Sequence, residues 1–314
     1  MSDTKTIAVV GATGAQGGGL VRAIAAHSDG AFTARAITRD PSSDAAQALA
    51  ALPNVEVVQA DADDEASLER AFAGCYGAFC VTFFWVDFSP EHELAQARNM
   101  AAAAKAAGVQ HVVWSTLEDT RHFVTDDRMP TLQGKYKVPH FDGKEDADAA
   151  FREADVPTTF LRTCFYWDNL IYFGLGPQRG EDGVLAITYP MGTSRLPGIA
   201  SEDIGKIAFG IFERGGGLIG ETVSVMGEAL TGAQMAEKLT GVLGEEVRYN
   251  DVDPDVYRGF GFPGADEVGN MFQFKRDFEA GYVGPRENDL ARTLNPELQT
   301  FDAWLGANGS RIPV

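Results

Sequence analysis

A glycine-rich run near the start of the chain has the residue types and spacing of a site that could hold phosphate. Residues 11–18 read GATGAQGG, follow the apolar segment 7–10 and open a helical window. Glycines lack a Cβ, so the backbone can approach a pyrophosphate, whose charge the amide groups and the helix dipole then stabilise. This context predicts a dinucleotide-binding turn, with a merely tight turn as the alternative. The predicted cofactor contacts are Gly11, Thr13, Gly14, Ala15, Gln16 and Gly17.

A single arginine stands where such a fold selects its cofactor. Arg39 ends the second predicted strand, 22 residues after Gly17. An acidic residue at this point would bind a ribose 2′-hydroxyl, whereas the donors of an arginine suit a 2′-phosphate. Arg39 therefore favours NADP(H) over NAD(H). An ordinary surface ion pair between Arg39 and Asp40 is the alternative.

Acidic and aromatic residues follow the next two predicted strands. Asp61 or Asp63 could accept a hydrogen bond from the adenine amino group. Asp63 or Asp64 could instead cap the following helix, because acidic residues are favoured at helix N-caps. The fourth strand ends at Thr82, a further predicted cofactor contact, and leads into the aromatic loop 83–88. That loop could wall a nicotinamide site, although half of its aromatic side chains could simply belong to the core.

These residues need a scaffold that brings strand ends together, and the pattern of the first half predicts one. Short β-branched runs alternate with alanine-rich helical windows, which indicates a parallel sheet wrapped by helices. Runs such as 7–10 are apolar throughout, as expected where helices cover both faces of a sheet. The predicted fold is α/β, a Rossmann-type doubly wound parallel sheet with a smaller mixed α/β C-terminal lobe. The predicted strands are 6–10, 33–38, 55–59, 78–82, 111–115 and 158–161.

In the second half of the chain, strand-like and helix-like segments alternate less regularly. Glycine-containing breaks at 174–177 and 215–217 divide it into shorter pieces. We expect residues 1–156 to form an NAD(P)-binding Rossmann domain and residues 157–314 a smaller lobe, parts of which could return to the first domain. The cleft between the two is the predicted ligand site.

The composition limits the partners and the compartment. The chain has 26 basic and 45 acidic residues, a net charge of −19, which repels phosphate backbones and anionic lipids. We therefore expect neither direct nucleic-acid binding nor membrane binding. The most apolar stretch, 78–86, is too short for a membrane helix, and a first strand near residue 5 leaves no room for a signal peptide, so a cytoplasmic location is expected. The three cysteines show no CxxC spacing, so no metal site is expected.

Several further motifs point to one family. The chain resembles the NmrA-like family, atypical relatives of the short-chain dehydrogenases, and is most similar to its NADPH-sensing redox-regulator branch. The resemblance covers nearly the whole chain and implies a Rossmann domain, NADP(H) at the carboxyl edge of the sheet, and either small-molecule reduction or sensing. The residues that carry it are 11–18, Thr38-Arg39, Val58-Gln59-Ala60-Asp61, 140–144 (HFDGK), Asp168-Asn169-Leu170, 261–265 (GFPGA), Asn270-Met271-Phe272, Leu294-Asn295-Pro296 and Trp304-Leu305.

The chain departs from ordinary short-chain dehydrogenases beside its lysine. Those enzymes carry a tyrosine four residues before the lysine, and here that position is His140, before Lys144. Lys144 could bind the nicotinamide ribose, while the missing phenol removes the usual proton donor. His140 could replace it or could be a cap or packing residue, and Tyr166 is another candidate acid. Ser115 stands where a dehydrogenase keeps a substrate-orienting hydroxyl. The candidate catalytic residues are therefore Lys144, His140 and Tyr166.

The absent tyrosine favours a redox-responsive NADPH sensor over an enzyme. The alternative is an NADPH-dependent reductase of a quinone, an enone or a similar small electrophile, which the aromatic loop 83–88 supports. The expected cofactor is NADP(H). A protein partner or a second copy of the chain is also expected, because a sensor must present its bound state to something else.

Overall fold

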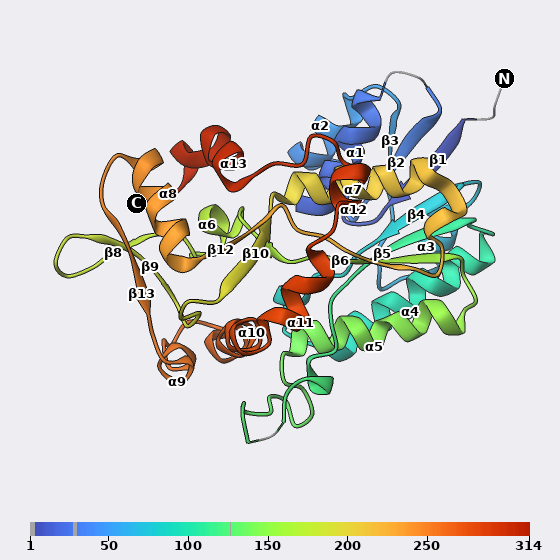
Figure 1. Ribbon diagram of the computed structural model, residues 1–314. Coiled ribbons are helices and arrows are strands. Elements are labelled where there is room, and N and C mark those ends of the chain that lie inside the picture. The colour runs from blue at the N-terminus through green and yellow to red at the C-terminus, as the bar shows by residue number, and fades with distance from the viewer. Residues whose placement is uncertain (1–3, 28–29, 126) are drawn as a thin grey trace.

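A seven-stranded parallel sheet contains strands from both halves of the chain (Figure 1). The structure is a computed structural model that describes residues 4–27, 30–125 and 127–314. The strand order is β11-β6-β5-β4-β1-β2-β3, so the direction of winding reverses between β1 and β4. The predicted Rossmann-type fold is confirmed. The strands are β1 (Lys5–Val9), β2 (Phe32–Thr38), β3 (Val55–Gln59), β4 (Gly77–Cys80), β5 (His111–Thr116), β6 (Thr158–Arg162) and β11 (Thr222–Ser224).

The strands read as continuous apolar runs because both of their faces are buried. In β1, Ile7 and Val9 belong to one hydrophobic cluster, while Ala8 belongs to the cluster on the opposite face. In β5, Val113 and Trp114 divide in the same way. Alternate side chains of a strand point to opposite faces, so each strand contributes to two cores.

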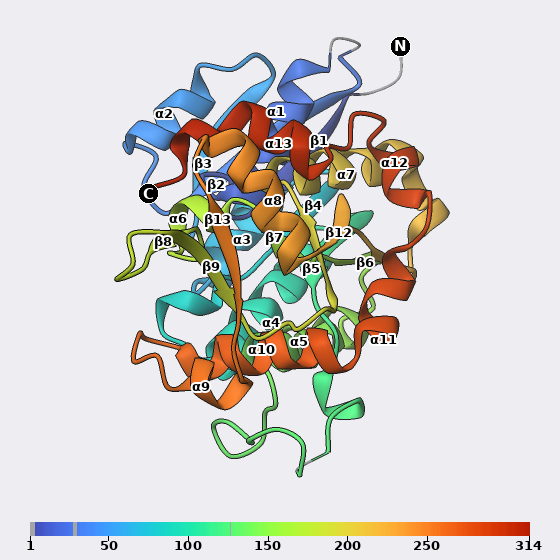
Figure 2. The ribbon, with the colours of Figure 1, turned by 60° about the vertical axis from the view of Figure 1, so that its left-hand side comes forward.

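Helices cover the sheet on both sides (Figures 1 and 2). Helices α1 and α7 contribute to the cluster on one face, and α3, α4 and α5 to the cluster on the other. Each crossover therefore places its strand's carboxyl end at the same edge of the sheet, where ligands of such folds bind. These helices are α1 (Ala15–Ala26), α2 (Asp44–Ala50), α3 (Glu65–Phe72), α4 (Pro90–Ala106), α5 (Pro139–Glu153) and α7 (Ser201–Arg214).

Two glycines let α1 and α7 approach each other closely. A Cβ at Gly205 would lie 2.1 Å from the amide nitrogen of Leu20, and one at Gly19 would lie 2.8 Å from the carbonyl oxygen of Glu202. Arg22 and Glu202 form an ion pair at the rim of the same contact. Because α1 begins at the glycine turn, a helix from the second half of the chain holds that turn in place.

The remaining residues form a smaller lobe around two three-stranded sheets, β12-β10-β7 and β13-β9-β8. Strands β6 and β11 and helix α7 follow residue 157 but belong to the main sheet and its helical layer, so the boundary expected at residue 156 falls within the main sheet. No helix in the described ranges is long and apolar enough to cross a membrane. The elements of the lobe are β7 (Phe165–Tyr166), α6 (Asn169–Tyr172), β8 (Gln178–Arg179), β9 (Leu185–Tyr189), β10 (Arg195–Ile199), β12 (Glu228–Thr231), α8 (Gly232–Leu243), β13 (Val247–Asp251), α9 (Pro254–Arg258), α10 (Ala265–Asp277), α11 (Glu279–Val283), α12 (Leu290–Leu294) and α13 (Phe301–Asn308).

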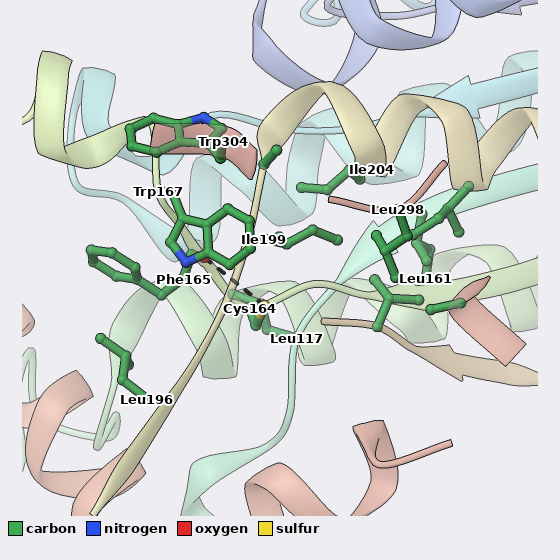
Figure 3. Packing of buried hydrophobic residues seen from close by; sticks show 14 of the residues in the cluster. Leu117, Leu161, Cys164, Phe165, Trp167, Leu196, Ile199, Ile204, Leu298 and Trp304 are labelled. Atoms are coloured by element: carbon green, nitrogen blue, oxygen red, sulfur yellow. Dashed lines mark hydrogen bonds between the residues drawn. The ribbon is translucent and has the colours of Figure 1, made fainter. Parts of the chain in front are cut away.

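A tryptophan-centred core joins this lobe to the main sheet (Figure 3). Trp167 and Trp304 lie with their ring centroids 6.3 Å apart. Ile199 of β10 and Ile204 of α7 belong to the same cluster. A Cβ at Gly198 would lie 2.1 Å from Trp167 Nε1, so β10 passes directly over the indole. The lobe is therefore packed firmly against the sheet.

Candidate functional site

The glycine turn joins β1 to α1 at the carboxyl edge of the sheet, beside the reversal of strand order. Gly11 has a φ of +67°, which residues with a side chain rarely adopt. A Cβ at Gly17 would lie 2.4 Å from the carbonyl oxygen of Gly11, but one at Gly14 would lie 3.2 Å from it. Thr13, Gly14 and Ala15 are exposed, and no side chain caps α1. The first amide groups of α1 are therefore available to an anion.

Gln16 uses its side chain to connect the turn with two other strand ends. Ser115 Oγ at the end of β5 donates to Gln16 Oε1 at 2.9 Å. Gln16 Nε2 donates to the hydroxyl of Tyr166 at 2.6 Å, and that hydroxyl lies 3.3 Å from Thr163 Oγ1. Burial raises the pKa of Tyr166 to about 12. Its hydroxyl therefore keeps its proton at neutral pH and is already part of a hydrogen-bonded network.

Arg39 is exposed at the end of β2, and its guanidinium makes no hydrogen bond or ion pair with any residue that the structure describes. Asp40 does not pair with it. The Asp40 carboxylate accepts hydrogen bonds from the Ser42 hydroxyl at 2.5 Å and the Ser42 amide at 2.9 Å, which lower its pKa. The arginine is thus free to bind an added anion.

The acidic residues after β3 hold the local loop together. Asp61 Oδ1 accepts from the amide of Asp63 at 3.1 Å. Asp64 caps α3 by accepting from the Ser67 amide, so the helix-cap alternative is confirmed for Asp64. Asp63 Oδ1 lies 2.7 Å from Nε2 of His92, whose Nδ1 lies 2.5 Å from Asp87. His92 therefore connects the loop after β3 with the end of the aromatic loop.

Lys144 lies on α5 and binds Thr82 and Glu93. Its Nζ donates to Thr82 Oγ1 at 2.8 Å, to the Thr82 carbonyl at 3.1 Å and to Glu93 Oε1 at 2.7 Å. The side chains of Lys144 and Glu93 are 11% and 3% exposed. Thr82 Oγ1 also donates to Glu93 at 2.5 Å. In this arrangement three acceptors occupy the ammonium group of Lys144.

His140 is buried against Glu267 of α10. Its backbone amide donates to Glu267 Oε1 at 2.9 Å, and its Nδ1 contacts the same oxygen. Burial lowers the pKa of His140 to about 3 and raises the pKa of Glu267 well above its usual range. The imidazole of His140 is therefore neutral near pH 7 and does not titrate in the range expected for an acid catalyst.

The aromatic loop surrounds the His140 ring and also reaches the surface. Trp85 and His140 have ring centroids 5.0 Å apart, and Trp85 is 6.4 Å from Phe173, which follows α6. Phe83 is 57% and Phe173 50% exposed, whereas Phe84 is buried. Part of the loop is thus core, as the sequence allowed, and part forms an exposed aromatic surface. We call Phe83, Trp85 and Phe173 the aromatic rim.

Cys164 is buried in the hydrophobic cluster of Leu117, Leu161 and Ile199 (Figure 3). Burial raises the pKa of its thiol to about 12. A thiol in this state is a poor nucleophile at neutral pH. Cys75 and Cys80 are also buried and free.

Beyond the aromatic rim lies a buried polar cluster that the sequence did not single out. Lys275 of α10 is 1% exposed, and Phe141, Phe165 and Tyr282 surround its ammonium group at 5.6–5.8 Å from Nζ to the ring centroids. Arg286 and Glu118 form a buried ion pair at 2.7 Å. Burial lowers the pKa of Lys275 to about 7.

Sequence reasoning missed the buried charged residues of this region, among them Glu93, Glu267 and Lys275. Glu93 and Glu267 lie in the first turns of α4 and α10, where acidic residues are common because of the helix dipole, so nothing in the pattern marks them as buried. Lys275 lies in the last turn of α10, where a basic residue is equally ordinary. A weak signal was available for Lys275, because apolar residues flank it at Met271, Phe272 and Phe274.

Comparison with known proteins identifies relatives along the whole chain. A model of the NmrA-like family matches residues 3–305. The NmrA-like family domain-containing oxidoreductase malD of Malbranchea aurantiaca is 31% identical over 261 residues, which are 78% of this chain and 75% of the relative.

Solved structures have the same fold. The negative transcriptional regulator NmrA in complex with NADP superposes with a TM-score of 0.77 at 24% identity, over 96% of this chain and 94% of its own. The triphenylmethane reductase of Citrobacter sp. complexed with NADP(H) gives a TM-score of 0.75 at 22% identity, over 96% and 99% of the two chains.

Proposed function

The chain belongs to the NmrA-like family, and from that premise we propose that it binds NADP(H) at the glycine turn and reduces a planar electrophile such as a quinone or an enone. Its relative malD is named an oxidoreductase, and one structure with the same fold is a reductase that binds NADP(H). Another is a transcriptional regulator bound to NADP, so the fold alone does not decide between catalysis and sensing.

The residues at the carboxyl edge of the sheet fit an NADP(H) molecule. Gly14 and Ala15 are exposed at the uncapped start of α1, which suits a pyrophosphate. The unpaired guanidinium of Arg39 suits a 2′-phosphate. Lys144 and Thr82 would lie on the nicotinamide side, where Lys144 could exchange an internal acceptor for a ribose hydroxyl. When bound, NADPH supplies a hydride.

The aromatic rim is the observation that favours a reductase. Phe83 and Phe173 are half or more exposed, and with Trp85 they come from two segments that follow β4 and α6. Large exposed aromatic side chains beside a cofactor site can stack on a flat substrate and exclude water from it. A quinone or an enone matches this surface, because it is planar and its conjugated carbonyl accepts electrons.

NADPH oxidation followed at 340 nm with menadione and 2-cyclohexenone tests this proposal, beside a titration of NADPH binding without substrate. We expect binding and turnover, and we expect Phe83→Ser to raise the KM for menadione without changing the affinity for NADPH. Val314→Ser, which changes another exposed apolar residue, is the control. Absence of NADPH binding would overturn the proposed site.

The contacts of Lys144 favour a second candidate, an NADPH sensor. The ammonium group has three internal acceptors, Tyr166 is hydrogen-bonded to Gln16, and His140 is paired with Glu267. None of the three candidate acids is thus poised to give up a proton. Tight NADPH binding without turnover, together with a cofactor-dependent change in protease sensitivity, would support the sensor against the reductase.

A further inference from the structure

Lys275 is a buried base without an anionic partner. Its Nζ makes no hydrogen bond or ion pair with any residue in the described part of the chain, and three aromatic rings surround it instead. A buried ammonium group is normally paired, because the loss of hydration is costly. The four-carbon side chain is flexible, so the ammonium group can leave the rings for a better acceptor.

Several buried polar atoms around Lys275 have no hydrogen-bond partner among the described residues, including both carboxylate oxygens of Glu118. Tyr282 OH and Arg286 Nε are buried and have no hydrogen-bond partner among the described residues. Arg286 otherwise donates to the carbonyls of Thr163 and Tyr282, and pairs with Glu118. Lys275 Nζ, Tyr282 OH and Arg286 Nε are all donors. A ligand that carries an acceptor oxygen would satisfy these three donors.

The position of this cluster connects it with the proposed cofactor site. Two of the rings around Lys275, Phe141 and Phe165, are the sequence neighbours of His140 and Tyr166. After burial itself, the charge of Lys275 is the largest cause of the low pKa of His140, and Lys144 contributes in the same direction. Lys275 therefore lies on the lobe side of the residues expected around the nicotinamide.

We infer that Lys275 binds the carbonyl oxygen of a conjugated carbonyl substrate and donates the proton that completes its reduction. This inference rests on the proposed reductase function. As hydride from NADPH enters the electrophilic carbon, the electron pair of the conjugated system moves to the carbonyl oxygen. The N–H bond of Lys275 breaks as the O–H bond forms, which leaves NADP⁺, an enol and a neutral amine. Solvent returns a proton to Lys275.

Lys275 also has the protonation behaviour that this step needs. Burial is the main cause of its lowered pKa of about 7, the charge of Arg286 adds to the effect, and the charge of Glu118 opposes it. Burial lowers the pKa of His140 on α5 to about 3, so its imidazole is neutral near pH 7, and burial raises the pKa of Glu267 on the same helix as Lys275. A proton donor is most effective when its pKa lies close to the working pH.

Two variants separate proton donation from charge. Lys275→Met removes the amine at similar volume, and Lys275→Arg keeps a cation that does not release its proton. With menadione or 2-cyclohexenone we expect wild-type kcat to fall as pH rises above about 7, and both variants to lose about a hundredfold or more in kcat and that pH dependence. Lys275→Arg should retain the wild-type KM more closely than Lys275→Met. The affinity for NADPH should not change, and Lys105→Met on the surface of α4 is the control.

A second readout needs no turnover. Lys275 has a pKa of about 7 in the folded protein and an ordinary pKa of 10.5 in the unfolded chain. Between these two pH values the unfolded chain binds more protons than the folded protein. The free energy of unfolding therefore rises with pH in this range. Lys275→Met should flatten that rise.

Undiminished kcat in both variants, or the same pH dependence of stability in Lys275→Met and wild type, would overturn the inference while leaving the reductase function intact. Wild-type protein that binds NADPH but reduces neither substrate would overturn the reductase and this inference together.

Discussion

Single residues decide which cofactor is bound, and Arg39 is the clearest case. Its exposed guanidinium makes no hydrogen bond or ion pair with any described residue, although it interacts electrostatically with the carboxylate of Asp63. We expect NADPH to bind at least about tenfold tighter than NADH, a difference of about 1.4 kcal/mol. Arg39→Asp should remove or invert this preference, since it replaces attraction by repulsion. Fluorescence titrations with both cofactors measure the ratio.

Arg70→Asp is the matched control for Arg39. It makes the same change of charge in the last turn of α3, which runs back toward the opposite edge of the sheet. It should leave the ratio of affinities unchanged. If Arg39→Asp behaved like Arg70→Asp, another residue would select the cofactor.

The buried pair of Lys144 and Glu93 makes a prediction about stability. Lys144→Met leaves the Glu93 carboxylate buried without its cation and should lower the free energy of unfolding by about 3–5 kcal/mol. Adding Glu93→Gln removes the stranded charge and should recover most of that loss. Urea denaturation of the two variants measures both effects, and a double variant no more stable than Lys144→Met would contradict the pairing.

At the scale of elements, substitutions in the turn between β1 and α1 should affect cofactor binding and protein stability separately. A side chain at Gly14 meets only one carbonyl oxygen, at 3.2 Å, and the φ of −90° there suits any residue. Gly14→Val should therefore fold, with a melting temperature a few degrees lower, yet lose NADPH binding because its methyl groups occupy the space of the pyrophosphate.

Gly17→Ala should destabilise the protein more than Gly14→Val does. Its Cβ would lie 2.4 Å from the oxygen and 2.7 Å from the carbon of the Gly11 carbonyl, and neither atom can move without opening the turn. The smaller substitution should thus cost more stability, about 1–3 kcal/mol. Thermal unfolding compares the two variants directly, and a Gly17→Ala protein more stable than Gly14→Val would show that the turn is not packed as described.

The elements could be predicted from the sequence far better than the site. Strand β3 coincides with the predicted range 55–59 and β5 differs by one residue, because buried parallel strands are continuous apolar runs flanked by polar turns. The partners of His140 and Lys144 could not be predicted. Glu267 lies 127 residues from His140 in the sequence. A local sequence pattern does not predict which face of a distant helix will contact His140.

At the scale of the whole molecule, the contact between α1 and α7 unites the two halves of the chain. Gly205→Ala would place a Cβ 2.1 Å from the Leu20 amide and force the helices apart. We expect it to lower the free energy of unfolding by at least about 2 kcal/mol and to weaken NADPH binding, because α1 presents the turn. Denaturation and cofactor titration measure the two effects.

Gly241→Ala provides the comparison for that variant. Gly241 lies within α8, and nothing surrounds the position of its missing Cβ within 4 Å. The same substitution there should stabilise the protein by up to about 1 kcal/mol and leave NADPH binding unchanged. A loss of binding in Gly241→Ala equal to that in Gly205→Ala would mean that the helix contact has no special role.

The same contact sets an order of events during synthesis. Gly19 leaves the ribosome roughly 190 residues before Gly205, so at about 5–20 residues per second the inner face of α1 waits roughly 10–40 seconds for the helix that covers it. During that interval the first strands and their turn can form only an incomplete layer with an apolar surface open to water. The nascent chain therefore offers a chaperone a binding surface that the finished protein no longer has.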